Sequence, residues 1–541
     1  MMLCCKDKND HNECLIKLST QNNNMKKLPL GIQTFSQIRN KSENFLYIDK
    51  TDIALKMINA GKYYFLARPR RFGKSLFLDT LKNLFEGQQQ YFDGLYVADK
   101  WDWSIQYPVI NISFGAGVIQ NSDELEIRIL AIFKENQNRL KLTCHYPNNP
   151  RECFNELISL AYKKYQCKVV ILIDEYDKPI LDNIDDNATA TKIKEALKNI
   201  YSVIKDSDRY IKFALLTGVS KFSKVSLFSG LNNLYDISLI RDYATICGYT
   251  HQDIIEHFSD ELHDVNIDTL KQWYNGYNFL GESVYNPYDI LLFFHNHKEY
   301  RNYWFETGNP AFLIKVIKKN NYYIPDLDNI IVNEDELGSF DIDDIRLEVL
   351  LFQTGYLTIK AVNIFFNQRS YQLGYPNLEV RSALNTQIFK YLLASKPLYS
   401  LPMFQAITHR DMPQFKQAIQ QLFASIPADN YRKNLIQNYE GYYASVMYSY
   451  LAGLGIEFIA EDVTNKGRID LTIATPDLSQ VYIIEFKVLD KPTQTSNALA
   501  QIKSKRYYEK YQLNANYLYL IGIEFCKKER NICGFEWEQL I

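Results

Sequence analysis

Residues 481–487 read Val-Tyr-Ile-Ile-Glu-Phe-Lys, an apolar, β-branched and aromatic run that predicts a strand. Because side chains alternate along a strand, Glu485 and Lys487 should project from the same face. The stretch 471–474, Leu-Thr-Ile-Ala, predicts a preceding strand with Asp470 at its start. A hairpin between the two strands would bring Asp470 near Glu485.

Asp470, Glu485 and Lys487 are the residue types that metal-dependent cleavage of a phosphodiester requires. Two carboxylates can share a divalent cation, and a lysine can hold the scissile phosphate or the attacking water. A Glu-x-Lys triplet after a strand also occurs by chance, and here it could simply form an ion pair at the exposed edge of a hairpin. The downstream residues favour the catalytic interpretation, because residues 498–503 predict a helix that leads into a basic cluster of Lys503, Lys505, Arg506 and Lys510.

This arrangement resembles the PD-(D/E)XK nuclease superfamily, with Asp470 as the first acid and Glu485-Phe486-Lys487 as the E-x-K element. The resemblance implies a restriction-endonuclease-like α/β domain in which Asp470 and Glu485 hold one or two Mg²⁺ or Mn²⁺ ions. Lys487 would stabilise the charge that develops on the phosphate. Three further side chains could assist the site: Glu440, Glu461 and, by orienting water or a backbone phosphate, Gln501.

A second signature, Arg-Pro-Arg-Arg-Phe-Gly-Lys-Ser at 68–75, follows the apolar strand 63–67 and precedes an apolar pattern with helical spacing. A strand, a loop and then Gly-Lys-Ser opening a helix is the context of a P-loop, in which Gly73 and the neighbouring backbone N–H groups cradle phosphate oxygens. Lys74 would neutralise the β- and γ-phosphates of ATP, and the Ser75 hydroxyl would ligate Mg²⁺.

The loop departs from the generic P-loop pattern, because Arg68 stands where the first glycine is expected. The usual tight turn is therefore not expected at that position. Arg70 or Arg71 could face the nucleotide and compensate with charge-assisted contacts, or both could face solvent or the neighbouring domain. Without a matching acidic strand, the segment would be a basic turn before an ordinary helix.

Residues 168–177, Lys-Val-Val-Ile-Leu-Ile-Asp-Glu-Tyr-Asp, supply that acidic strand. A fully apolar run of this kind predicts a buried parallel strand, and its carboxyl end is the edge where open α/β sheets bind ligands. Asp174 would hold Mg²⁺ through water, and Glu175 would polarise the water that attacks ATP. A third strand, 211–216, is followed by Thr217 and Ser220, and either of them could sense the γ-phosphate or cap the next turn.

Together these segments resemble the AAA-ATPase-like family of bacterial proteins, whose members often carry a PD-(D/E)XK domain at the C-terminus. The resemblance covers nearly the whole chain from about residue 25. It implies an α/β protein in which an ATP-binding P-loop domain with a parallel sheet is fused to a nuclease-like module. The motifs that carry the resemblance include the segments 28–32, 47–51, 68–75, 173–177, 216–222, 274–277, 303–308 and 467–470.

The chain of 541 residues is long enough for about three domains. We expect an N-terminal extension at 1–24 that is disordered or mis-assigned, since Met25 is a natural start. The P-loop domain should span 25–250, and a mainly helical lid or linker region should span 251–425. The α/β nuclease-like domain should occupy 426–541.

The charge, cysteine content and hydropathy of the sequence limit the partners and the cellular compartment that we expect for the protein. The formal net charge of −2 excludes a global electrostatic footprint for nucleic acid, so any such surface must be local. Nine cysteines without a zinc-like pair of pairs indicate reduced thiols in a cytoplasmic protein. No apolar run approaches the roughly 20 residues that span a bilayer, so we expect no membrane partner.

The leading hypothesis is an ATP-binding and ATP-hydrolysing protein that controls a Mg²⁺-dependent nuclease. Its substrate would be nucleic acid, with DNA favoured over RNA, and the protein could assemble as a homo-oligomer. A second hypothesis is a signalling ATPase whose C-terminal domain only binds nucleic acid or protein. A third is an assembly scaffold in which ATP sets the oligomeric state and neither site turns over.

Overall fold

The computed structural model describes residues 26–221, 233–305, 323–338, 346–366, 368–393, 401–426, 440–475, 477–491 and 498–541, together with residues 227, 231 and 317. The chain divides into two compact units. The first comprises Met1–Trp304 and Asp335–Gly355, and the second comprises Phe305–Glu334 and Tyr356–Ile541. The predicted extension at 1–24 lies outside the described residues.

A five-stranded parallel sheet forms the centre of the first unit. Its strands are β1 (Tyr63–Ala67), β2 (Val109–Ser113), β3 (Val169–Asp174), β4 (Ile211–Gly218) and β5 (Tyr235–Asp236), in the order β2-β3-β4-β1-β5. Both β1 and β3 are buried along their full length, as their uninterrupted apolar runs predict. The carboxyl ends of β1, β3 and β4 therefore meet at one edge of the sheet, where the sequence places the candidate nucleotide site.

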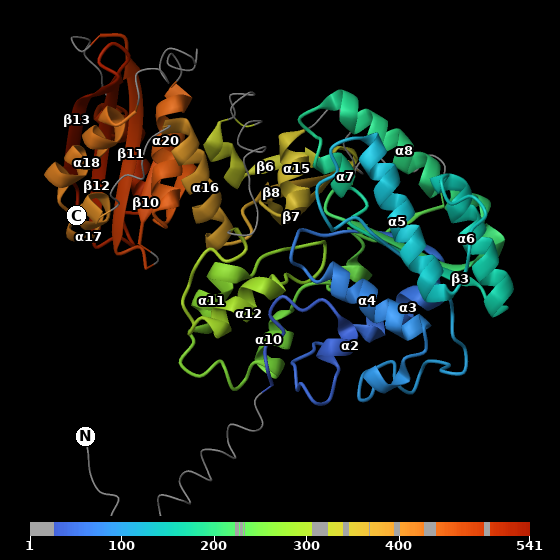
Figure 1. The fold of residues 1–541 in the computed structure, drawn as a ribbon. Coiled ribbons are helices and arrows are strands. Elements are labelled where there is room, and N and C mark those ends of the chain that lie inside the picture. Colours follow the sequence, from blue (N-terminus) through green and yellow to red (C-terminus); the bar gives the residue numbers. More distant parts are fainter. Residues whose placement is uncertain are drawn as a thin grey trace, which may run out of the picture. The chain divides into compact units, whose positions relative to one another are not determined.

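Helices cover both faces of this sheet. In Figure 1, α5 (Ser122–Leu140), α6 (Pro150–Tyr165) and α8 (Asn187–Asp206) form one layer, and α3 (Thr51–Ala60) and α4 (Lys74–Phe85) lie on the other side of β3. Each of these helices buries one apolar stripe, which is the pattern of amphipathic helices packed on a sheet. The first unit also holds the helices α10 (His251–His257), α11 (Ile267–Tyr274), α12 (Pro287–His295) and α15 (Leu347–Thr354).

The middle of the chain is mainly helical, as predicted, but it also contains a small antiparallel sheet that the sequence did not reveal. This sheet has the strand order β6-β8-β7 and belongs to the second unit. Its strands are β6 (Ile330–Asn333), β7 (Thr358–Phe365) and β8 (Gln368–Gly374). The helices that follow it are α16 (Leu378–Leu393), α17 (Leu401–His409), α18 (Met412–Ala424) and α20 (Glu440–Gly453).

A second five-stranded sheet forms the C-terminal part of the second unit. Its strands are β9 (Phe458–Thr464), β10 (Gly467–Ala474), β11 (Gln480–Leu489), β12 (Tyr517–Cys526) and β13 (Asn531–Gln539), in the order β13-β12-β11-β10-β9. The pair β11–β12 is parallel and the other neighbours are antiparallel, so the sheet is mixed.

The crossover between the parallel strands β11 and β12 carries the helix α21 (Ala498–Lys505), as the sequence predicts. Ile502 of this helix is fully buried among Ile483 of β11 and Leu520 of β12. The helix is therefore held on the sheet face beside the E-x-K element. Within the described ranges, no helix combines the length and the apolarity needed to cross a membrane.

Candidate functional site

The P-loop lies between the end of β1 and the start of α4. Gly73 has φ +91°, a left-handed conformation that L side chains rarely adopt, and α4 begins at the next residue, Lys74. The glycine therefore turns the chain directly into the helix. The backbone N–H groups of the first turn point out of the helix N-terminus, where they can accept an anion.

Lys74 folds back over the loop that precedes it. Its Nζ donates hydrogen bonds to the carbonyl oxygens of Arg68 and Pro69, each at 2.8 Å. The side chain is only 7% exposed, and burial lowers the pKa of its ammonium group. A bound triphosphate would offer anionic oxygens in place of these neutral carbonyls, and charge-assisted hydrogen bonds of that kind are the stronger ones.

Asp174, at the end of β3, joins the P-loop to the neighbouring strand β4. Its Oδ2 accepts the Ser75 hydroxyl at 2.6 Å, and its Oδ1 accepts the Thr217 hydroxyl at 2.7 Å. A carboxylate and a hydroxyl oxygen in direct contact are ligands that suit Mg²⁺, which prefers oxygen donors and retains several waters. The residues present therefore fit the predicted metal. The Thr217 contact indicates a positioning role toward Asp174, and a direct contact with the γ-phosphate stays a prediction.

Glu175 follows Asp174 in the left-handed region, with φ +53°, and its backbone N–H donates to Asp174 Oδ1 at 3.0 Å. This strained turn points the side chain away from β3, toward Gly115 beyond the end of β2. Burial, and then the charge of Asp174, raise the pKa of Glu175. A carboxylate with a raised pKa is better suited to accept a proton from water than an ordinary surface glutamate is.

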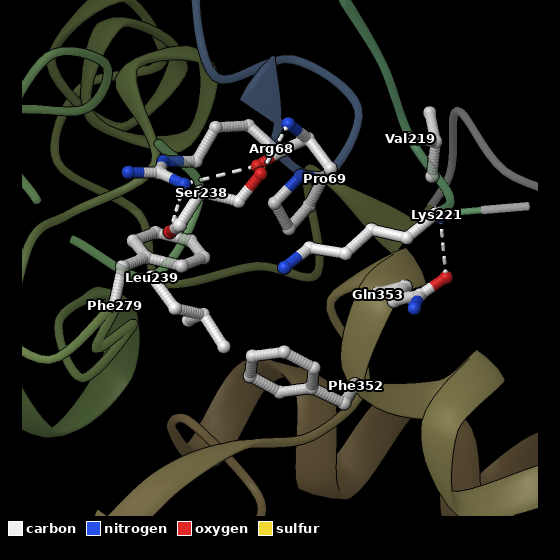
Figure 2. Close-up of a pocket in the computed structure, with 10 residues that line it drawn as sticks. Arg68, Pro69, Val219, Lys221, Ser238, Leu239, Phe279, Phe352 and Gln353 are labelled. Carbon is white, nitrogen blue, oxygen red and sulfur yellow. Dashed lines mark hydrogen bonds between the residues drawn. The ribbon is translucent and has the colours of Figure 1, made fainter. Parts of the chain in front are cut away.

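Arg68 has a structural role that the sequence reasoning missed. Its guanidinium donates to four backbone carbonyls and lies 3.9 Å from the centre of the Phe279 ring (Figure 2). The side chain is 1% exposed, and burial lowers the pKa of Arg68 to about 10. The arginine in the place of the first glycine thus ties the loop to the segment after β5, whose carbonyl acceptors include those of Ser238 and Tyr243. Nothing in the sequence separates such an arginine from a phosphate-binding one.

The other two arginines of the loop are exposed. The Arg71 guanidinium lies 4.7 Å from the centre of the Tyr288 ring, and Arg71 itself has φ +68°. Arg70 is close enough to Glu175 that its charge partly offsets the rise in the pKa of that carboxyl caused by burial. Contact of either arginine with a nucleotide stays a prediction.

Asp177 is a second buried acid that the sequence reasoning left without a role. It is 1% exposed and accepts hydrogen bonds from the Val219 and Ser220 backbone N–H groups at 3.1 and 2.6 Å, and from the Ser220 hydroxyl at 2.5 Å. Burial raises the pKa of Asp177. This carboxylate therefore ties the end of β3 to the end of β4, next to the predicted magnesium site.

In the second unit, β10 and β11 pair as the predicted hairpin, with Leu471 opposite Ile484. The next position along the hairpin places Asp470 beside Glu485, and Asp470 Oδ2 accepts the Phe486 backbone N–H at 2.6 Å. Lys487 Nζ lies 3.8 Å from Glu485 Oε1. Asp470, Glu485 and Lys487 therefore converge at one place on two adjacent strands, as the sequence predicts.

Gln501 of α21 donates its side-chain amide to Glu485 Oε1. The glutamine therefore orients this carboxylate, and its helix packs beside the strand as the sequence predicted. Orientation of water or of a backbone phosphate by Gln501 stays a prediction. Glu485 is only 2% exposed and Asp470, on the adjacent strand, is partly exposed. Neighbouring carboxylates repel one another, and a cation between them relieves this repulsion. The donor set thus fits a divalent ion.

The carboxylates of Asp470 and Glu485 suit a metal ion that keeps part of its water shell. Among the residues that the structure describes, no group of three or more His, Cys, Asp or Glu side chains is arranged to hold a metal ion. Mg²⁺ is commonly held by one or two carboxylates with water in the remaining positions. Asp470 and Glu485 provide such a pair.

Glu461 lies on the strand next to Asp470, at an irregularity of β9 where φ is +50°. It accepts a hydrogen bond from the Tyr323 hydroxyl at 3.0 Å. Burial, Glu461 and Asp470 all raise the pKa of Tyr323, so the phenol stands close to both acids. Tyr323 is 138 residues away in sequence, so no local pattern could have found it. The side chain of the other candidate acid, Glu440, lies outside the described residues.

The basic cluster has less free positive charge to offer a nucleic-acid backbone than the sequence suggests. Lys503 pairs with Glu538 at 2.6 Å, Lys510 pairs with Asp462, and Arg506 lies 3.5 Å from Glu509. These carboxylates reduce the local positive charge that a nucleic-acid backbone would meet.

Two family models match the chain. One is described as "Predicted AAA-ATPase" and matches residues 29–228, and the other is described as the PD-(D/E)XK nuclease superfamily and matches residues 438–535. A protein of Azotobacter chroococcum mcd 1, described as an uncharacterized protein in the vnfD 5′ region, is 47% identical over 518 residues. The alignment covers 95% of this chain and 99% of that relative.

Fold and sites together define a P-loop ATPase-like domain joined to a domain of the PD-(D/E)XK nuclease superfamily. The chain belongs to the AAA-ATPase-like family and also carries this C-terminal domain, and the Azotobacter protein is a relative along almost its entire length. The resemblance seen in the motifs and the α/β fold class are thereby confirmed.

Proposed function

We propose that this protein is an ATP-controlled, metal-dependent nuclease. The observation that carries the proposal is the convergence of Asp470, Glu485 and Lys487 on two adjacent strands, with Gln501 bonded to the glutamate. A chain that also holds a P-loop lysine and a paired Ser75–Asp174 site has the parts to bind ATP.

In the first unit, the N-terminus of α4 and Lys74 bind the phosphates. Ser75 and Asp174 hold Mg²⁺, which supplies charge neutralisation at the β- and γ-phosphates. Thr217 fixes the orientation of Asp174. Glu175, turned out of β3 beside the metal-binding acid, takes the proton of the attacking water.

In the second unit, Asp470 and Glu485 hold one or two Mg²⁺ or Mn²⁺ ions, which supply Lewis-acid chemistry at the phosphodiester. Gln501 keeps Glu485 in its orientation. Lys487 stabilises the charge that develops on the phosphate oxygens, because its ammonium group lies within a few ångströms of the carboxylate pair. The substrate is nucleic acid, and DNA is favoured over RNA.

A second candidate is a signalling or scaffold ATPase whose C-terminal domain only binds nucleic acid or protein. The observation in its favour is the neutralised basic cluster, in which Lys503 and Lys510 are engaged by carboxylates. Lysines paired in this way contribute little to the electrostatic attraction of a polyanion. Assembly into a homo-oligomer would be the output of such a protein.

Calorimetric titration of the full chain with Mn²⁺, in the absence of nucleotide, distinguishes the nuclease from the signalling or scaffold ATPase. We expect Asp470→Ala and Glu485→Ala to remove a binding event that the parent shows. Lys487→Ala should retain the binding event and lose cleavage, because an ammonium group does not ligate a cation. Equal Mn²⁺ binding by the parent and the Asp470→Ala chain would support the second candidate instead.

A further inference from the structure

The polypeptide passes between its two compact units at residues 304–305, 334–335 and 355–356. The residues before the first and the last of these connections both contact the P-loop. Trp304 is 5% exposed, and its indole N–H donates to the carbonyl oxygen of Arg70 at 3.2 Å. The first connection therefore starts from a side chain that is bonded to the loop.

Gly355 starts the last connection, and it lies against the preceding loop residue. It ends α15 with φ +92°, and a Cβ placed on it would lie 2.7 Å from Pro69 Cβ and 3.4 Å from Trp304 Cζ2. Cβ atoms do not approach another carbon as closely as 2.7 Å, so only glycine allows α15 to end directly against the loop. Two consecutive P-loop residues, Pro69 and Arg70, thus touch the two exit points of the first unit.

The last turn of α15 also binds the chain that follows β4. The Gln353 side-chain oxygen accepts the Lys221 backbone N–H at 2.8 Å, three residues beyond the end of the strand. Figure 2 shows Phe352 and Gln353 on one wall of a pocket that Arg68 and Pro69 line on another. The end of α15 therefore rests on the two elements that flank the expected phosphates, which are the P-loop and the end of β4.

The hydrogen bonds of Lys74 connect the packing of α15 on the P-loop to nucleotide binding. In the structure its ammonium holds the carbonyls of Arg68 and Pro69. A triphosphate would compete for the same ammonium group and release both carbonyls, so the backbone at 69–70 would lose one of the constraints that hold it while the Arg68 side chain stays anchored. Because Pro69 and Arg70 carry the contacts with Gly355 and Trp304, a rearrangement there reaches both connections.

We propose that Trp304 and Gly355 form a relay that transmits nucleotide occupancy of the P-loop to the connections leading into the nuclease-like unit. The inference rests on the proposed function for the identity of the P-loop ligand. It assigns the coupling to two residues outside both sets of reacting groups. Their substitution therefore uncouples the units without removing a group that binds phosphate or metal.

The test is hydrogen–deuterium exchange of the full chain, with and without Mg²⁺ and a non-hydrolysable ATP analogue. Trp304→Phe removes the N–H donor and keeps a ring, and Gly355→Ala introduces the close contact with Pro69. Trp103→Phe is the matched control for the first, because Trp103 donates its indole N–H to the Ala98 carbonyl at 2.8 Å, away from the loop. Gly94→Ala is the control for the second, because Gly94 has φ +75° and no atom within 4 Å of its added Cβ.

In the parent and both controls, the analogue should change exchange in peptides 299–305 and 346–358. In Trp304→Phe and Gly355→Ala this response should fall by about half or more, while the analogue Kd stays within about twofold of the parent value. A full response in Trp304→Phe, or in a folded Gly355→Ala chain, overturns the relay. A parent that binds the analogue without any change in these peptides also overturns the relay alone, whereas a parent that binds no ATP overturns the proposed function as well.

Discussion

In the proposed ATPase site, Glu175 is the residue on which turnover of ATP should depend most strongly. It follows Asp174, the proposed Mg²⁺ ligand, and is turned out of the strand by a left-handed backbone, and burial raises its pKa. We predict that Glu175→Gln retains ATP binding and loses turnover by roughly 10²–10⁴-fold, because an amide cannot take the proton of the attacking water. Phosphate release and nucleotide binding, measured on the same preparation, check the two halves of this prediction.

The exposed Glu126 on α5 offers a matched control, since Glu126→Gln makes the same chemical change away from the site. Lys74→Ala should instead abolish binding, because it removes the cation that faces the β- and γ-phosphates. Hydrolysis by Glu175→Gln at the parental rate would show that the proton acceptor has been assigned to the wrong residue.

The sequence identified most of the candidate site side chains, but it did not predict the hydrogen-bond partners that hold each of them in place. Asp470, Glu485 and Lys487 were found because alternation along a strand and a short hairpin are local rules. The structural role of Arg68 was not predicted, because three of its four carbonyl partners come from the segment after β5, about 170 residues further along the chain. Such a partner is set by tertiary packing, on which a local motif has no bearing.

Between elements, Asp177 is the clamp that joins the ends of β3 and β4. It is buried and accepts three hydrogen bonds from residues 219 and 220. We predict that Asp177→Asn lowers the free energy of unfolding by roughly 2–3 kcal/mol, because the amide presents donors where the site already supplies donors. Urea denaturation should show a lower midpoint with an unchanged m-value.

The exposed Asp260 is a suitable comparison, since Asp260→Asn alters no buried partner. It should leave the denaturation midpoint within experimental error. A midpoint for Asp177→Asn that matches the control would mean that the clamp contributes nothing to stability, and the link between the two strand ends would have to be sought elsewhere.

Helices and strands with a clear hydrophobic pattern in their own sequence were predictable. Strands without such a pattern, which form only by pairing with distant segments, were not. The strands β1, β3 and β11 and the helix α4 follow from uninterrupted apolar runs or helical spacing. The strands β6, β7 and β8 were missed: β6 has only four residues, and β7 carries exposed apolar residues such as Ile364 at 67%. A strand that short, or one with apolar residues at exposed positions, gives no clear strand signal in a single sequence.

For the whole molecule, the abundance of tyrosine sets its behaviour in alkali. Burial raises the pKa of Tyr443 and of Tyr450, both on α20, to about 12. Between the unperturbed tyrosine pKa of about 10 and this value, the unfolded chain loses a phenolic proton that the fold retains. The stability contribution of each buried phenol is therefore complete below about pH 10 and is lost as the pH rises toward about 12.

We predict that Tyr450→Phe shifts alkaline unfolding to higher pH, with a gain of roughly 2–3 kcal/mol over the parent near pH 12. Circular dichroism followed across the alkaline range, together with phenolate absorbance, measures both events. Tyr517→Phe, at a side chain that is 37% exposed, is the comparison and should leave the transition in place. The same midpoint for Tyr450→Phe and the parent would contradict the raised pKa.

In the proposed function, one chain couples an ATP site to metal-dependent cleavage of nucleic acid. The most direct measurement follows cleavage of a panel of single- and double-stranded DNA and RNA by the full chain with Mg²⁺ or Mn²⁺, with and without ATP. We predict cleavage that depends on ATP in the parent, is absent in Asp470→Ala and no longer responds to ATP in Lys74→Ala. Absence of cleavage of every substrate under all conditions, or equal cleavage by the parent and Asp470→Ala, would contradict the account.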